Sequence, residues 1–379
     1  AQGFGVMVSH AFGAKDFKLL RHYVALSLIL TLIISLLLTI PTVTASRLLL
    51  AWMHTPENII SMADAYIKVI FAGILLTMAY NVVSGILRGI GDSRTPLYFL
   101  ILSSVLNIIL DVVLIVYTGL GTAGAAYATI IAQGVSAVLC FFYMYRKYDI
   151  LRTRHEDYYL DSAGVKNMLA IGVPMALNYS ITAIGTMIMQ SAVNVFGSSV
   201  VAAFTAASKV SNIATQSMPT LGTAMATYCG QNLGAGKYDR IYAGMRQGLF
   251  LCFGAAATAA AICIFGGRFI VSWFVSNPSE EIFSSAMQYL TIASWFFLPL
   301  AMIFLYRNAL QGLDQGLIPM LSGVIELACR FGVIALVPAS TGFFGVCFAD
   351  PAAWVGAGIP LFVTYLLWEH RMKQCPKAA

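Results

Sequence analysis

Four polar residues lie within one apolar segment that is long enough to cross a membrane. Residues 97–117 contain Ser103, Ser104, Asn107 and Asp111. About 20 apolar helical residues span the hydrocarbon core of a bilayer. Because positions 103, 107 and 111 step by four, these side chains share one face of a helix. An acid in hydrocarbon is costly and indicates a functional site, so we expect Asp111 to handle an ion. The alternative is an Asp that only hydrogen-bonds a neighbouring helix.

Two later apolar segments carry longer polar stripes. Polar residues recur every four positions within 168–196, and every three or four within 199–233. Lipid would satisfy none of these groups, so the two faces must be wet or bonded across helices. Two adjacent stripes favour a shared water-filled cleft, which we expect to bind substrate. Its expected lining is Asn178, Thr182, Thr186, Gln190, Asn194, Lys209, Asn212 and Gln216. Lys209 could instead extend outward toward the membrane surface.

Other residues indicate structural or gating roles. Glu326 and Arg330 lie four positions apart in an apolar segment, so we expect them to form an ion pair, with coupling or gating as the alternative role. Pro174, Pro219 and Pro299 lie within expected helices, where each proline frees a backbone carbonyl and permits a bend.

The composition excludes an ordinary soluble domain. Hydrophobic residues make up 59% of the 379 residues, charged residues only 10%, and the mean hydropathy is +0.81. These values predict an all-α integral membrane protein. The expected spans are 19–41, 59–87, 97–117, 122–145, 168–196, 199–233, 241–265, 282–311, 318–338 and 344–368. The net charge of +6 comes from loops and reports membrane topology rather than nucleic-acid binding.

No constellation of residues predicts catalysis or a cofactor. The five histidines are scattered and offer no metal set. The segments GLGTAG at 119–124 and GQNLGAGK at 230–237 resemble nucleotide-binding loops, but they lack the surrounding strand–loop–helix context. We interpret both as turns between helices. The sequence therefore predicts a protein that is not an enzyme.

The basic loop residues predict the orientation. On one side of the membrane, the loops contain only two basic residues, Arg47 and Arg268. Cytoplasmic loops carry an excess of Lys and Arg, so the loops on the other side, and the C-terminus, are expected in the cytoplasm. The cytoplasmic set is Lys15, Lys18, Arg21, Arg88, Arg94, Arg146, Lys147, Arg152, Arg154, Lys166, Lys237, Arg240, Arg246, Arg307, Arg371, Lys373 and Lys377.

The chain repeats at an offset of 221 to 223 residues. HAFGAKD at 10–16 matches QNLGAGK at 231–237, and LRGIGDSRTP ending at Pro96 matches LQGLDQGLIP ending at Pro319. The repeat predicts two six-helix bundles related by duplication. We expect an N-terminal lobe at 1–149, a cytoplasmic linker at 150–166 and a C-terminal lobe at 167–379. The repeat also predicts a full protein of twelve helices, of which about ten or eleven are present here after an N-terminal truncation of roughly 60 residues.

These motifs, with NIILD, GTAGAAYATIIAQ and YCGQNLGAGKYDR, resemble the multidrug and toxic compound extrusion (MATE) transporters of bacteria. The resemblance implies a V-shaped pair of lobes and an N-lobe cation site. It assigns Asn107, Asp111 and Thr129 to this site, with Asn81 as a neighbour and Tyr66 as a weaker one. The family's first-helix acid would fall in the missing segment. Some members also carry acids on helices seven and ten, and this chain has none in the apolar parts of either, so a C-lobe cation route is in doubt.

The resemblance implies a cation-coupled antiporter that uses H⁺ or Na⁺ and exports organic, cationic or amphiphilic, drugs by alternating access. It implies no cofactor beyond the coupling ion, small-molecule substrates, a monomer, and the bacterial inner membrane as location. The closest rival is a flippase of lipid-linked precursors or peptides from the same superfamily. Its cleft would be more basic, and only Lys209 and Arg330 are expected basic residues here. A membrane-embedded enzyme and a passive channel are further alternatives.

Overall fold

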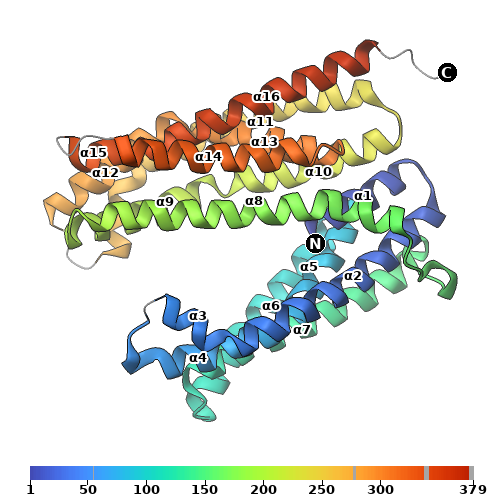
Figure 1. Cartoon of the computed structure of the whole chain (residues 1–379), viewed down its shortest axis with the longest axis horizontal. Helices are drawn as coiled ribbons and strands as arrows, with labels where there is room; N and C mark the ends of the chain where they lie inside the picture. Colours follow the sequence, from blue (N-terminus) through green and yellow to red (C-terminus); the bar gives the residue numbers. More distant parts are fainter. Residues whose placement is uncertain (54, 276–278, 337–340, 375–379) are drawn as a thin grey trace. The chain divides into compact units, whose positions relative to one another are not determined.

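The computed structural model describes residues 1–53, 55–275, 279–336 and 341–374, and every regular element within them is helical. The chain divides into two compact units, Ala1–Gly172 and Val173–Ala379 (Figure 1). Unit 1 holds α1 (Gln2–Gly13), α2 (Phe17–Thr44), α3 (Ser46–Trp52), α4 (Glu57–Ala72), α5 (Ile74–Gly89), α6 (Arg94–Val112), a π-helical turn (Val113–Tyr117), α7 (Gly121–Lys147), two 3₁₀ turns (Asp149–Leu151 and His155–Asp157) and the start of α8 (Ser162–Asn194).

Unit 2 contains the rest of α8 and all later helices. They are α9 (Ser198–Thr215), α10 (Ser217–Gly234), α11 (Tyr238–Phe274), α12 (Glu280–Trp295), α13 (Phe297–Gly312), α14 (Leu317–Leu336), α15 (Gly342–Val346) and α16 (Ala349–Gln374). Its core joins side chains from α8 to α16, with Met218, Leu290 and Phe297 fully buried at its centre.

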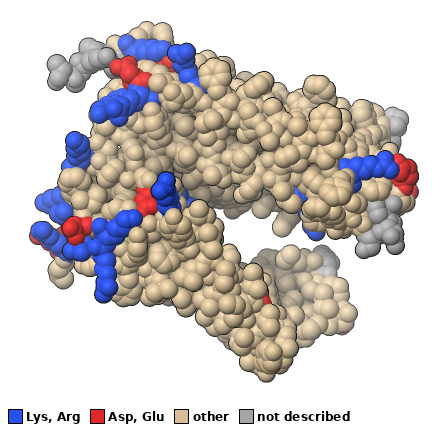
Figure 2. Space-filling view, turned by 180° about the vertical axis from the view of Figure 1, so that it is seen from behind, with Lys and Arg blue, Asp and Glu red and all other residues tan. Residues whose placement is uncertain are grey.

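The helices have the length and hydropathy of membrane spans. Within the described residues, seven helices are long and apolar enough to cross a bilayer, or up to nine if each sharply bent pair counts as one span. The charged side chains of each unit gather near helix ends, and its long sides are mostly uncharged (Figure 2). This distribution is that of a multi-pass membrane protein, because hydrocarbon tolerates apolar side chains and excludes charges.

The duplication extends to the backbone. Lys15 and Gly236 both have a positive φ, as do Gly91 and Asp314, and also Gly121 and Gly342. The members of each pair lie 221 or 223 residues apart, at matching turns. The bends match as well: α4 and α5 meet at Gly73 at 45°, and α12 and α13 meet at the equivalent Phe296 at 52°.

Three expected spans are therefore interrupted. The spans predicted at 59–87 and 282–311 are the two bent pairs, and the span predicted at 199–233 divides into α9 and α10 at Gln216. Pro219 and Pro299 are each the third residue of the helix that follows a break, so the expectation that they lie inside continuous helices was wrong. A proline in the first turn removes no helical hydrogen bond. Pro174 does lie inside α8.

The connection between the units is anchored to α2. His22 Nε2 lies 2.6 Å from Asp161 Oδ1, its Nδ1 lies 3.0 Å from the carbonyl oxygen of Asp157, and its ring stacks on Tyr159. Asp161 also accepts the N–H of Gly164 at the start of α8. This hydrogen bond, and the contact with His22, hold the pKa of Asp161 below its usual value. The predicted linker is thus held against α2 of unit 1.

The turn between α5 and α6 is held by one carboxylate. Asp92 accepts hydrogen bonds from the backbone N–H of Arg94, from the N–H and hydroxyl of Thr95, and from the hydroxyl of Tyr148. Partial burial acts to raise the pKa of Asp92, but the hydrogen bonds from Thr95 and Tyr148 outweigh it, so the net pKa lies well below its usual range. Asp92 thereby joins the start of α6 to the end of α7.

Candidate functional site

Unit 2 contains an open cavity of about 600 Å³ at the level of the two polar stripes. The cavity is lined from α8, α9, α10, α12, α13, α14 and α16. Seven of the eight expected cleft residues line it: Asn178, Thr182, Thr186, Gln190, Lys209, Asn212 and Gln216. Asn194 is not among the lining residues, and its side-chain oxygen accepts a hydrogen bond from Gln190.

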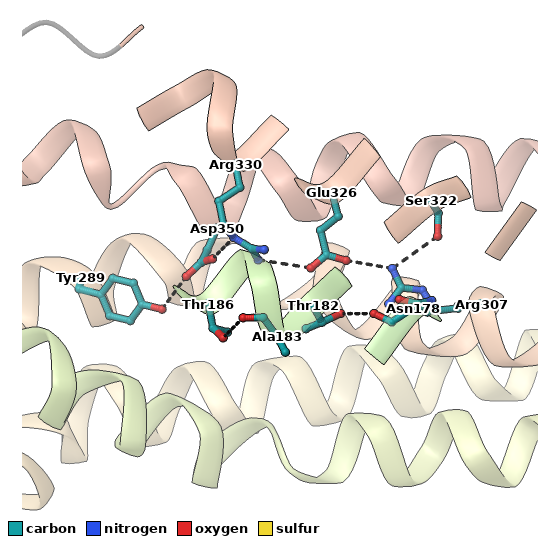
Figure 3. Close-up of polar contacts among 10 residues, drawn as sticks. All are labelled: Asn178, Thr182, Ala183, Thr186, Tyr289, Arg307, Ser322, Glu326, Arg330 and Asp350. Atoms are coloured by element: carbon teal, nitrogen blue, oxygen red, sulfur yellow. Dashed lines mark hydrogen bonds and ion pairs between the residues drawn. The ribbon is translucent and has the colours of Figure 1, made fainter. Parts of the chain in front are cut away.

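The polar stripe on α8 is partly bonded to backbone. Thr182 donates to the carbonyl of Asn178, and Thr186 donates to the carbonyl of Ala183 (Figure 3). Asn178 donates to the carbonyl of Pro319 on α14. These bonds satisfy each donor hydrogen of the two threonines and leave their oxygens able to accept. The stripe therefore combines interhelical contact with a polar cavity wall.

A chain of buried ion pairs lies along one side of the cavity (Figure 3). Arg330 donates from Nη2 to Glu326 at 3.3 Å, which is the pair expected from their spacing, and from Nε to Asp350 at 2.9 Å. Arg307 donates to the other oxygen of Glu326 at 3.0 Å, and Tyr289 donates to the other oxygen of Asp350 at 2.9 Å. The four charged side chains are between 5% and 13% exposed, so each charge relies on its partners.

Arg307 corrects one topological prediction. It was counted among the basic residues of the cytoplasmic loops, but it lies inside α13, is 9% exposed and pairs with Glu326. A basic residue near the end of an apolar segment resembles a loop residue in the sequence. Here the acid that neutralises it comes from another helix, 19 residues away.

Asp350 was missed by the sequence prediction. It is the second residue of α16 and receives bonds from Arg330 and Tyr289. The available signal was an isolated acid inside the apolar segment 344–368, followed directly by a proline. Its partners come from two other helices, so spacing along the chain does not reveal them.

Lys209 lies on the cavity wall without an acidic partner among the described residues. Its ammonium lies 5.4 Å from the centre of the Phe274 ring, a cation–π contact, and the residue is exposed. The adjacent Ser208 also lines the cavity, and its buried hydroxyl has no hydrogen-bond partner in the described part of the chain.

Unit 1 brings together part of the expected cation site. The amide of Asn107 on α6 donates to the hydroxyl of Thr129 on α7 at 3.4 Å. Asp111 lies one turn further along α6, and its buried Oδ1 has no hydrogen-bond partner among the described residues. Gln133, one turn beyond Thr129, likewise has a buried Oε1 without such a partner.

The helix changes its winding next to Asp111. The π-helical turn begins at Val113, two residues after the acid, and such turns often occur at functional sites. Gly124 on α7 lies against this turn: a side chain there would place Cβ 2.8 Å from the carbonyl oxygen of Leu114. The absence of a side chain therefore allows α7 to approach the altered turn closely.

Two expected members of the cation site are not joined to it by hydrogen bonds in the described residues. Asn81 donates instead to the carbonyl of Thr77 on its own helix, at 2.8 Å. Tyr66 on α4 is 40% exposed. Of the five residues expected at the cation site, Asn107 and Thr129 are therefore the only two joined by a side-chain hydrogen bond among the described residues.

The repeat relates the two polar groups. Asn107 and Thr129 in unit 1 correspond to Arg330 and Asp350 in unit 2, at offsets of 223 and 221 residues, and Ile334 takes the place of Asp111. Both pairs are in contact, the first by a hydrogen bond and the second by an ion pair. In unit 2 the contact therefore contains its own cation, the guanidinium of Arg330.

Within the described residues, the fold is that of an all-helical multi-pass membrane protein with two polar groups inside its helical bundles. A sequence model of the MatE family matches residues 1–113 and 174–336. The chain therefore belongs to the MATE family of multidrug efflux transporters, which are multi-pass membrane proteins and not enzymes.

Individual relatives agree with this assignment. The chain is 28% identical to the "Probable multidrug resistance protein YpnP" of Bacillus subtilis, over 95% of this chain and 80% of that protein. It is 25% identical to the "Probable multidrug resistance protein NorM" of Thermotoga maritima, over 94% of this chain and 76% of that protein. A crystal structure described as "MATE in complex with MaL6" superposes with a TM-score of 0.90 at 22% identity, over 98% of this chain and 85% of the other, which shows the shared fold.

Proposed function

We propose that this protein is a cation-coupled antiporter that exports organic, drug-like amphiphiles, with the coupling cation bound at Asp111 and the substrate bound in the cavity of unit 2. The coupling cation is H⁺ or Na⁺. The names of the relatives support an efflux function, and the two polar groups of the chain supply one candidate site for each of the two transported species.

The observation that carries the proposal is the unpartnered oxygen of Asp111 among the described residues. A buried carboxylate oxygen without a donor is unfavourable, whereas a proton or a Na⁺ ion would satisfy it. Asn107 on α6 and Thr129 on α7 add neutral oxygen atoms one turn away along α6. Neutral oxygens and one carboxylate are ligands that suit a hard monovalent cation.

Coupling requires only that the cation and the substrate favour different conformations. If binding at Asp111 stabilises the outward-open state, the inward cation gradient shifts the equilibrium and promotes release of substrate outside. The bends at Gly73 and Phe296 and the π-helical turn after Asp111 are places where helices can change shape without losing regular hydrogen bonds elsewhere.

We also propose that the end of each unit that is rich in Lys and Arg faces the cytoplasm, together with the C-terminus. The turn of unit 2 at Lys237 and Arg240, and the final helical turn with Arg371 and Lys373, are basic. Arg307 no longer contributes to this argument, because it is buried, but the remaining loop residues keep the same bias.

A flippase for an amphiphile with a phosphate headgroup is a second candidate. The sequence suggested only two basic residues for the cleft, and the structure adds Arg307 as a third lining residue. Two of these three are neutralised by Glu326 and Asp350, so the cavity is less basic than the count suggests.

Transport by the protein in sealed proteoliposomes tests the proposal. Efflux of a fluorescent amphiphile should accelerate when an inward Na⁺ gradient or an inward pH gradient is imposed, and the effective gradient identifies the coupling ion. Flux that ignores both gradients would identify a passive pathway and contradict antiport.

A further inference from the structure

The cavity of unit 2 holds two carboxylates, and both are already fully engaged. Each oxygen of Glu326 accepts from an arginine, and the oxygens of Asp350 accept from Arg330 and Tyr289. A cationic substrate would have to displace a buried guanidinium from one of them. Separating a buried ion pair leaves two charges poorly solvated, so this exchange is unfavourable.

The internal repeat also indicates that the cavity of unit 2 has no free acid for a cationic substrate. Arg330 occupies the position that corresponds to Asn107, and its guanidinium contacts the residue that corresponds to Thr129. Ile334 replaces the acid of unit 1. The polar group of unit 2 therefore corresponds to that of unit 1, but it contains the guanidinium of Arg330 and has no unpaired acid.

The positive charge of Lys209 is not balanced by an acidic side chain among the described residues. It is the one cationic cavity residue that forms no ion pair within the described part of the chain, and Phe274 provides only the face of an aromatic ring. With Arg307 and Arg330 balanced by Glu326 and Asp350, the cavity has an excess of one positive charge. Its apolar lining includes Met175, Met189, Phe204 and Phe304.

We propose that the cavity selects amphiphiles that carry an anionic group, and that Lys209 binds this group while the apolar body lies against the methionine and phenylalanine side chains. This inference rests on the proposed export function and specifies its substrate class. It differs from the cationic substrates that the family resemblance implied. Methionines suit a variable apolar body, because their side chains adapt to different shapes.

Binding of two dyes with the same aromatic core tests the inference without transport. Fluorescein is an anion and tetramethylrhodamine methyl ester is a cation, and both contain a xanthene ring system. Their binding to the purified protein in a neutral detergent at low salt can be followed by anisotropy and by quenching of tryptophan, since Trp354 lines the cavity. We expect fluorescein to bind about tenfold more tightly than the cationic dye.

Variants of Lys209 separate charge from shape. We expect Lys209→Ala to weaken fluorescein binding by up to about fivefold, the range of an exposed ion pair, and Lys209→Glu to weaken it by about tenfold and so to abolish the preference. Lys237→Glu is the matched control, since Lys237 precedes α11 and does not line the cavity. It should leave both affinities unchanged.

The same assay can distinguish which anionic group the cavity prefers, a carboxylate or a lipid phosphate. Naphthoate and short-chain phosphatidic acid are added as competitors of fluorescein, and the stronger competitor shows whether a carboxylate or a lipid phosphate fits better. Tighter binding of the cationic dye, with no response to Lys209→Glu, would overturn the inference. Because these are binding measurements, that result leaves gradient-driven export unaffected, and a failure of export leaves the binding preference intact.

Discussion

Replacing Gly185 with alanine should destabilise the protein, whereas Gly→Ala inside a helix usually stabilises it. This residue is buried in α8, and the Nη1 atom of Arg330 lies where its side chain would be. A Cβ added at Gly185 would be 2.0 Å from Nη1 and 3.2 Å from Cζ of Arg330. The guanidinium must then move, although it is held by Glu326 and Asp350.

The magnitude follows from two opposing terms. Gly→Ala inside a helix normally stabilises by about 1 kcal/mol. Breaking a buried ion pair costs about 3–5 kcal/mol, because the abandoned charges are not resolvated. We therefore expect Gly185→Ala to lower the free energy of unfolding by about 2–4 kcal/mol.

The assay is thermal unfolding of the detergent-solubilised protein, compared with Gly254→Ala. Gly254 lies inside α11, and a Cβ added there would meet no atom within 4 Å, so the control should be neutral or slightly stabilised. If Gly185→Ala is as stable as Gly254→Ala, Arg330 is not held by Glu326 and Asp350, and the account of the cavity wall is wrong.

Two further predictions concern the loops. Asp92→Asn should lower the free energy of unfolding by about 1–3 kcal/mol, because the amide cannot accept every donor that converges on the carboxylate, and thermal unfolding checks this. Asp161→Asn should destabilise the protein near neutral pH but have less effect under acid conditions. The pKa of Asp161 is depressed in the folded state, so its contribution is present above the unfolded value of about 3.9 and disappears as the pH falls through the folded value. Unfolding of both proteins across this pH range should show the difference shrinking below about pH 4, and a constant difference would exclude the ionised contact with His22.

Local periodicity explains what the sequence could predict. The polar stripe from Asn178 to Gln190 repeats every four residues, so its shared helix face is visible without a structure. The duplicated turns were visible too, because each needs a particular backbone conformation, as at Gly91 and Asp314. These features depend on residues that are close together in the chain.

Contacts between helices could not be predicted in this way. Arg307 and Glu326 come from α13 and α14, and Asp350 joins them from α16, so no spacing rule connects the three. Asn194 follows the same period as Gln190 but lies one turn beyond the cavity wall. The end of a polar stripe does not show where the cavity itself ends.

The most direct test of the central claim is gradient-driven efflux by Asp111→Asn in proteoliposomes. The amide keeps the size of the side chain but removes the charge that would bind H⁺ or Na⁺. Asp64→Asn is the matched control, since Asp64 also lies in an apolar helix of unit 1 but is already bonded to Ser46 and Lys68. We expect Asp111→Asn to fold, to bind dye, and to lose the acceleration by the cation gradient, while Asp64→Asn retains it. Full gradient-dependent efflux by Asp111→Asn would contradict the assignment of the coupling site.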